Sequence, residues 1–126
     1  MSDSISEKLA DAVRGAGEPP REVVEKLLID VAGLCVAARN TDYVHAALAG
    51  WEASGKCTAI GHARALDSAG AAFVNGTAAH GEDFDDTFEG GPIHAGAVIV
   101  PAVLALSERE RLPARRQCGP LRSASS

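Results

Sequence analysis

The sequence predicts an all-α protein built like a small helical bundle, on grounds of composition and of pattern. Apolar residues make up 46% of the 126 residues, yet the chain has only one Trp, one Tyr and three Phe. A core made mainly of Ala, Leu and Val suits closely packed helices, whereas sheet sandwiches and barrels use more β-branched and aromatic residues. Apolar residues also recur at intervals of three and four along much of the chain, which is the helical period. A chain of this length can bury a core without disulfides or a metal.

The first two helices are expected over residues 4–15 and 21–39. Ser4 or Ser6 can cap the first one, and Gly15 ends it. Pro19 and Pro20 restart the chain, because a proline near a helix start removes an N–H that has no helical partner. The second helix has the clearest amphipathic pattern in the sequence. Its apolar positions are Val23, Val24, Leu27, Leu28, Val31, Leu34, Cys35 and Ala38.

Three further helices are expected over residues 43–54, 68–79 and 95–110. Gly55 and Lys56 are predicted to end the third helix, and residues 57–61 form a short extended piece. The fourth helix contains Gly70 and Gly76, each costing roughly 1 kcal/mol relative to alanine, so close packing or function must compensate. Pro101 is expected to bend the last helix.

Composition excludes several function classes. The net charge is −5 with three lysines, which does not suit a phosphate backbone, so we expect no nucleic-acid partner. Three widely spaced cysteines indicate reduced thiols rather than a disulfide framework. The N-terminus has no signal-peptide pattern, and the longest apolar stretch, residues 95–106, is too short to span a bilayer. We therefore expect a soluble, cytoplasmic protein with no membrane partner.

The chain changes character after Leu112. Residues 113–126 contain three arginines, two prolines and no acid, without an apolar period. This composition predicts a disordered tail. We therefore expect a helical domain over residues 1–112 and an unrelated tail over residues 113–126.

The segment from residue 80 to residue 94 is the best candidate for chemistry. Its titratable residues are His80, Glu82, Asp83, Asp85, Asp86, Glu89 and His94. Carboxylates this close together cannot all ionise cheaply if any is buried, so one of them is a candidate proton carrier beside two histidines. Glycines on both sides of the segment let the backbone bring these groups together.

Two other interpretations of this segment stay open. An acidic run between helices is often only a solvated cap. His80, Asp83, Asp85 and His94 are also acceptable ligands for a divalent ion, but the spacing fits neither an EF-hand nor a standard zinc motif. We rank the metal site below the solvated cap and expect no metal or other cofactor. His45 and His62 are interpreted as surface or helix-end histidines, and Trp51 as a core residue.

The same region resembles a known family over three runs of residues. They are Ala72-Phe73-Val74-Asn75-Gly76-Thr77-Ala78-Ala79-His80, Asp83-Phe84-Asp85-Asp86-Thr87 and His94-Ala95-Gly96-Ala97-Val98-Ile99-Val100-Pro101-Ala102. In this order they resemble the MmgE/PrpD family, which includes 2-methylcitrate dehydratase and cis-aconitate decarboxylase. The resemblance covers roughly residues 5 to 112.

The resemblance implies a cofactor-independent homodimeric enzyme with a large helical domain and a smaller α/β lid. Its members act on small di- and tricarboxylic acids by dehydration, decarboxylation or isomerisation, with proton transfer beside a carboxylate. By position, Asp83 and His94 match catalytic residues of the family. His80, Asp86 and Thr87 are the corresponding candidates for contact with the substrate.

The sequence also departs from the family pattern. Residues 88–94 lack the His-Pro pair that other members place after the threonine, which indicates a different subfamily and substrate. The resemblance covers the N-terminal helical portion alone, without the lid, and no lysine stands near the acidic segment. We therefore expect part of a carboxylic-acid lyase or isomerase that is an incomplete catalyst alone, and a frameshift or truncation near Leu112. The alternative hypothesis is a non-catalytic helical module for dimerisation.

Overall fold

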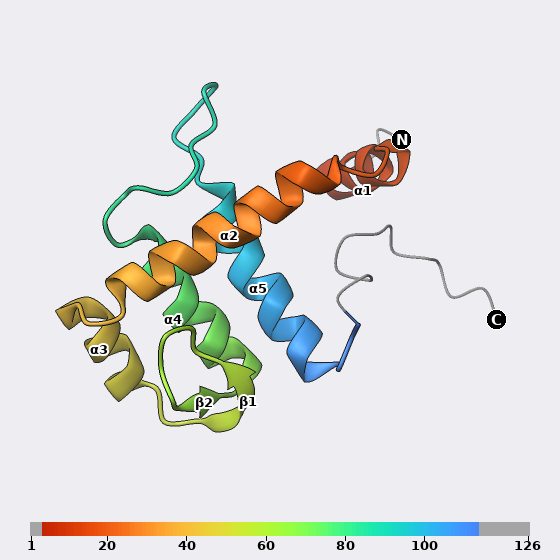
Figure 1. Ribbon diagram of the computed structural model, residues 1–126. Coiled ribbons are helices and arrows are strands. Elements are labelled where there is room, and N and C mark those ends of the chain that lie inside the picture. The colour runs from red at the N-terminus through yellow and green to blue at the C-terminus, as the bar shows by residue number, and fades with distance from the viewer. Residues whose placement is uncertain (1–3, 114–126) are drawn as a thin grey trace.

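The computed structural model describes residues 4–113 of the chain (Figure 1). Its elements in order are α1 (Ile5–Gly15), α2 (Arg21–Ala38), α3 (Asp42–Gly50), β1 (Ser54–Thr58), β2 (Ala65–Leu66), α4 (Ser68–His80) and α5 (Ala95–Arg109). The largely helical class expected from the sequence is confirmed. The expected disordered tail, apart from Pro113, lies outside the described residues.

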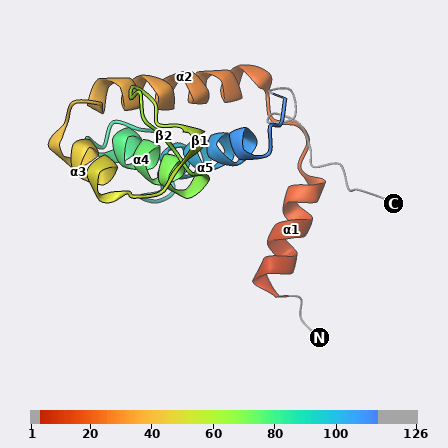
Figure 2. The same ribbon diagram turned by 90° about the horizontal axis from the view of Figure 1, so that it is seen from below.

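Helices α4 and α5 form the centre of the molecule. They pack against each other more extensively than any other pair, and α2 packs against both of them. In Figure 1, α2 runs obliquely across these two helices, with α3 and the small sheet near the lower end of α4. Figure 2 shows α1 projecting away from this body, and no residue of α1 is buried. Within the described residues, no helix is long and apolar enough to cross a membrane.

Helix starts follow local capping chemistry. Ser4 caps α1 in a capping box with Glu7: the Ser4 hydroxyl accepts from the Glu7 N–H, and the Glu7 carboxylate accepts from the Ser4 N–H. Asp67 caps α4 by accepting from the Gly70 N–H at 2.8 Å. The predicted use of Ser4 as a cap is therefore confirmed.

The predicted end of the third helix was wrong. Helix α3 stops at Gly50, and residues 54–58 form β1, which pairs antiparallel with β2. Gly55 lies inside this strand rather than at a helix end. A Cβ there would lie 2.5 Å from the Leu66 carbonyl oxygen, so only glycine lets the two backbones approach. The pairing of β1 with β2 outweighs the local helical pattern of this segment.

Small side chains fill the core, as the composition indicated. Each central helix buries alanines, a valine or a cysteine against its neighbours rather than large aromatic rings. The glycines of α4 serve close packing: a Cβ at Gly76 would lie 3.2 Å from the Ala97 carbonyl of α5, and one at Gly70 would collide with the Trp51 indole. Pro101 is buried within α5, which runs as one helix through that position.

A buried asparagine joins α4 to the segment after β1. Asn75 is 3% exposed. Its Oδ1 accepts from the Ile60 N–H at 2.8 Å, and its Nδ2 donates to the Thr58 carbonyl at 2.8 Å. The Cys35 thiol donates to the backbone carbonyl of Asn75 at 3.3 Å. The part of the resemblance that contains Asn75 therefore has a structural role here.

Replacing Asn75 with alanine is expected to lower the free energy of unfolding by about 2 to 4 kcal/mol, because the Ile60 N–H and the Thr58 carbonyl lose their partner in a partly buried place. Urea unfolding followed by circular dichroism measures the change. The control is Asn40→Ala, at an exposed turn position, with an expected effect within about 0.5 kcal/mol. Equal, small effects of the two substitutions would contradict this role of Asn75.

The two described cysteines are expected to be unreactive in the folded chain. Burial raises the pKa of the Cys35 thiol to about 11, and the pKa of Cys57 is raised by burial and by the nearby Glu108 and Asp67 carboxylates. Because the thiolate is the reactive form, iodoacetamide at neutral pH should label both residues only after unfolding. Peptide mapping by mass spectrometry measures this, and rapid labelling of Cys35 in the native chain would contradict it.

Candidate active site

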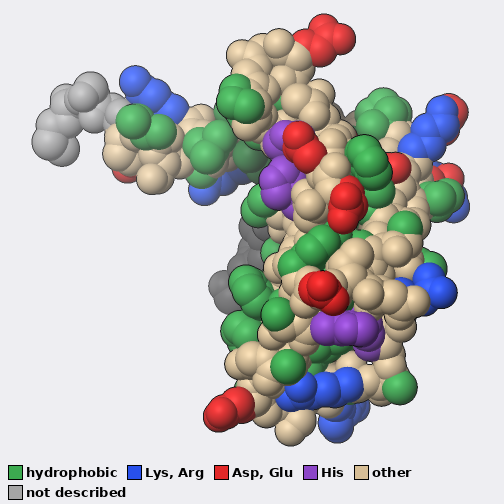
Figure 3. All heavy atoms as spheres, turned by 90° about the vertical axis from the view of Figure 1, so that its left-hand side faces the viewer, with side chains coloured by type: hydrophobic (Ala, Val, Ile, Leu, Met, Phe, Trp, Pro, Cys, Tyr) green, Lys and Arg blue, Asp and Glu red, His purple; other side chains and the backbone are tan. Residues whose placement is uncertain are grey.

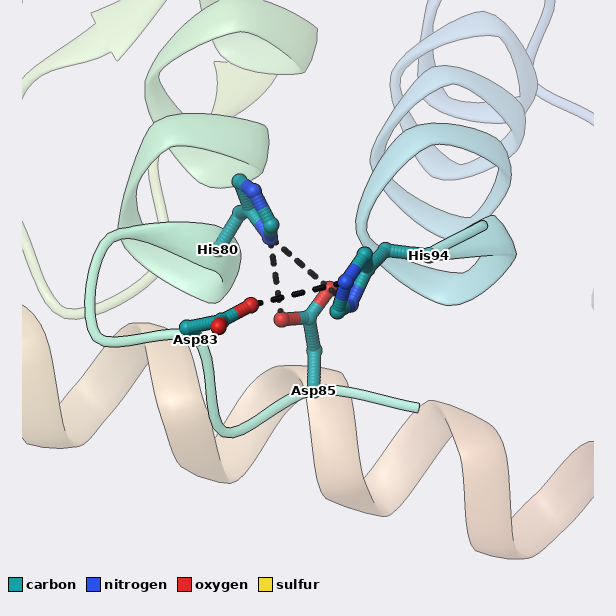
Figure 4. Close-up of side chains that lie close together, drawn as sticks. All are labelled: His80, Asp83, Asp85 and His94. Atoms are coloured by element: carbon teal, nitrogen blue, oxygen red, sulfur yellow. Dashed lines mark hydrogen bonds and ion pairs between the residues drawn. The ribbon is translucent and has the colours of Figure 1, made fainter. Parts of the chain in front are cut away.

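Four side chains converge where α4 ends and α5 begins. His80 is the last residue of α4, and His94 immediately precedes the first residue of α5. Asp83 and Asp85 lie on the loop between them, and Figure 4 shows all four side chains pointing toward a common point. The packing of α4 against α5 is what brings the two histidines together, with their ring centroids 4.7 Å apart.

The loop turns sharply at Asp83. Its N–H donates to the His80 carbonyl at 2.9 Å, and its φ is 57°, in the left-handed region. Aspartate tolerates this region better than most residues with a side chain. The turn places the Asp83 carboxylate beside the His94 ring, with Oδ1 3.4 Å from Nε2.

Asp85 lies beneath both histidines. Its carboxylate has no exposed surface, whereas the Asp83 side chain is 76% exposed. Asp85 lies within hydrogen-bond distance of His80 Nδ1, at 3.0 Å for Oδ1 and 3.2 Å for Oδ2. Its Oδ2 is also 3.3 Å from His94 Nδ1, a buried nitrogen that makes no well-formed hydrogen bond within the described residues. The His94 ring therefore has a buried carboxylate on one side and an exposed one on the other.

The two remaining predicted site residues lie beside this cluster. Asp86 Oδ1 accepts a hydrogen bond from the Gly96 N–H at 2.8 Å. A side chain at position 96 would collide with this carboxylate, because its Cβ would lie 2.1 Å from Oδ1. Asp86 therefore holds the first turn of α5 in place. Thr87 is exposed on the loop. Contact of His80, Asp86 and Thr87 with a substrate stays a prediction.

The cluster contains two carboxylates and two histidines, with no lysine or arginine among the four residues. Within residues 4–113, Asp83 and Asp85 form their ion pairs with the two histidines. Figure 3 shows acidic and histidine side chains lying beside one another on one face of the molecule. A small polycarboxylate would therefore need positive charge from outside this cluster.

The same four residues could offer one ligand atom each to a metal ion, since suitable atoms all lie within 4.8 Å of one another. Two imidazoles and two carboxylates are donors that divalent transition metals accept. These atoms are already paired with one another as hydrogen bonds or ion pairs. His80 Nδ1 and both carboxylates have polar partners within the cluster, whereas His94 Nδ1 makes no well-formed hydrogen bond within the described residues.

Sequence reasoning missed the role of Asp85, which it named only among the titratable residues of the segment and as a candidate metal ligand. In the run Asp83-Phe84-Asp85, hydrophobicity predicts that the phenylalanine is buried. The structure has the reverse, with Phe84 75% exposed and Asp85 6% exposed. No local pattern indicates this inversion, because it depends on the two histidines that meet over Asp85.

The other candidate residues lie elsewhere. His45 is exposed and His62 half-buried, with ring centroids 6.4 Å apart. Desolvation lowers the pKa of His62, and the neighbouring His45 and Arg39 lower it further. Trp51, expected in the core, is half-buried: its ring stacks on Phe73, and its Nε1 donates to Asp67 at 2.8 Å.

Comparison with known proteins identifies the class. The model of the MmgE/PrpD N-terminal domain matches residues 9–116. The chain belongs to this family. The match extends past the boundary expected at residue 112, and the expected division into domain and tail stays a prediction.

The chain is similar to cis-aconitate decarboxylase from Aspergillus terreus, with 32% identity over 96 residues. The match covers 71% of this chain and 19% of that protein, and the protein of A. terreus strain NIH 2624 / FGSC A1156 gives the same figures. The chain therefore spans about a fifth of the length of these relatives. No solved structure shows a significant match.

Proposed function

We propose that the chain supplies Asp83 and His94 to the active site of a cofactor-independent lyase or isomerase acting on a small di- or tricarboxylic acid. The observation that carries the proposal is the contact of the exposed Asp83 carboxylate with His94 Nε2, at 3.4 Å. Membership of the family and the likeness to cis-aconitate decarboxylase support the lyase class. The location in the cytoplasm stays a prediction.

The chemistry that suits this pair is proton transfer at a carbon beside a carboxylate. In dehydration or isomerisation, the pair takes a proton from that carbon, and the C–H electrons stay with the substrate. The proton then leaves with hydroxide as water, or returns to the opposite face. In decarboxylation the C–C bond breaks, carbon dioxide leaves, and the pair delivers a proton to the carbon. Positioned acid–base groups of this kind contribute about 10²- to 10⁴-fold to the rate.

The charge of the cluster makes the cluster part of the proposed site rather than the whole of it. A substrate with two or three carboxylates approaching Asp83 would be repelled unless cations balance it. We propose that lysine, arginine or histidine side chains outside the described cluster provide this balance. In this proposal His80, Asp86 and Thr87 contact the substrate from the side that the chain contributes.

Turnover of cis-aconitate, citrate-like and aspartate-like acids tests the proposal. Asp83→Asn is expected to lower kcat by about 100-fold or more, because the amide cannot hold the transferred proton. The matched control is Glu89→Gln, an exposed acid on the same loop, with turnover expected to be unchanged. Treatment with EDTA is expected to leave the rate unchanged. Full activity of Asp83→Asn, or activity lost to EDTA, would contradict the proposal.

A second candidate function, a homodimerisation module without catalysis, is favoured by exposed apolar residues on two helices. On α1, Ile5, Leu9 and Val13 are 86%, 64% and 66% exposed, and Figure 3 shows hydrophobic side chains at the surface of this projecting helix. On α5, Val98 and Ile99 are 71% and 56% exposed. Apolar groups collected on a face are typical of surfaces that meet another protein.

The molecular mass of the chain in solution, measured by light scattering, tests this second candidate function. The chain is expected to have the mass of a dimer, and Val98→Glu is expected to convert it to a monomer, because a charge would be buried in the contact. The control Ala46→Glu, at an exposed position of α3, should leave the dimer intact. A dimer with no turnover of any of the acids would favour the module over the enzyme. A monomer at every concentration would exclude it.

A further inference from the structure

We propose that Asp85 is a positioning residue that holds a proton on Nδ1 of both His80 and His94. In each neutral ring, Nε2 is then left as the free base. The consequence for catalysis rests on the proposed function. The proton positions themselves follow from the geometry of the cluster and are measurable without a substrate.

The argument begins with what a carboxylate can do. An ionised carboxylate only accepts hydrogen bonds. Asp85 is fully enclosed and lies 3.0 Å from His80 Nδ1 and 3.3 Å from His94 Nδ1. The His80 contact is aligned as a hydrogen bond, and the His94 contact is an ion-pair distance without that alignment. A lone pair on either nitrogen would lie within 3.3 Å of a carboxylate oxygen and leave a buried charge poorly compensated. Both Nδ1 atoms therefore carry hydrogen, and the tautomer of each neutral ring is fixed by this second partner.

The neighbouring polar groups do not compete for the two rings. Glu82 accepts a hydrogen bond from the Tyr43 hydroxyl at 3.0 Å, which turns it toward α3. Asp86 accepts from the Gly96 N–H at the start of α5. Asp85 is thus the carboxylate that faces both Nδ1 atoms in the described part of the chain.

The fixed tautomer of His94 determines what its other nitrogen offers. Nε2 lies 3.4 Å from Asp83 Oδ1. If Nε2 and the Asp83 carboxylate both lacked a proton, two lone pairs would face each other at this distance. A proton taken up by the free Nε2 would lie between the two atoms and remove that repulsion. The Asp83–His94 pair is therefore built to hold one proton and exchange it with a substrate on the exposed side of Asp83, while Asp85 keeps the opposite side of the ring fixed.

Long-range ¹H–¹⁵N spectra of the chain test this inference, because ring nitrogen shifts report which nitrogen carries hydrogen. Spectra at alkaline pH, where an ordinary imidazole is neutral, are expected to show Nδ1–H for His80 and His94. Single His→Gln variants assign the signals, and the exposed His45 provides the reference for an unconstrained ring. This test uses the chain with Asp85 intact. An unprotonated Nδ1 in either His80 or His94 would overturn the inference.

A pair of isosteric variants sharpens the test. In Asp85→Asn one of the two oxygens becomes an NH₂, which donates rather than accepts. The rings lie nearest different oxygens, His80 nearest Oδ1 and His94 nearest Oδ2, so one ring keeps an acceptor and the other faces the NH₂. The other ring, expected to be His94 because its contact is longer, should change to Nε2–H. The matched control Asp83→Asn alters the group beside Nε2 and should leave both Nδ1 protons in place. Thermal melting confirms that each variant is folded, and unchanged tautomers in a folded Asp85→Asn would overturn the inference.

Turnover separates failure of this inference from failure of the proposed function. Asp85→Asn is expected to lower kcat by about 100-fold and to change KM by less than about twofold, since Asp85 is enclosed and meets no substrate. Fixed tautomers in a chain without turnover would leave the inference standing and remove the proposed function. Turnover in a chain whose histidine tautomers are not fixed would leave the proposed function standing and overturn this inference. Unchanged kcat in Asp85→Asn would overturn the positioning role of Asp85.

Discussion

The close contact of α4 with α5 is the constraint on which the site depends. Small residues such as Gly76 and Ala97 let the two helices approach, so the end of one and the start of the other lie side by side. His80 and His94 then meet over a single carboxylate. A larger residue at Gly76 would separate the helices and with them the histidines. The packing of α4 against α5 therefore determines the geometry of the histidine–carboxylate cluster.

Sequence reasoning recovered much of this arrangement, for physical reasons that differ between regions. The period of α2 and the cap at Ser4 are local signals, and both helices begin where those signals indicate. The end of α3 was wrong because Gly55 pairs with a strand that no local pattern reveals. Asp83 and His94 were expected in one site because they match catalytic residues of the family by position in the sequence. The burial of Asp85 was not expected, because it depends on two histidines at the ends of different helices.

The site has an unusual balance of charge for a protein related to an enzyme of carboxylic acids. In the described part of the chain, Asp83 and Asp85 are paired with histidines rather than with lysine or arginine. This arrangement suits the handling of a proton better than the anchoring of an anion, because histidine can gain and lose a proton near neutral pH. In our account, proton transfer and substrate anchoring are separate tasks, and this chain provides the first.

Incorporation of solvent deuterium tests the proton-transfer role of the Asp83–His94 pair most directly. When a carboxylic acid is decarboxylated or isomerised in heavy water, mass spectrometry should find one deuterium at the carbon that receives the proton. Our account predicts that His94→Gln abolishes this incorporation and that Glu89→Gln keeps it. Deuterium incorporated at the normal rate by His94→Gln, or decarboxylation or isomerisation without any deuterium in the product, would contradict the account.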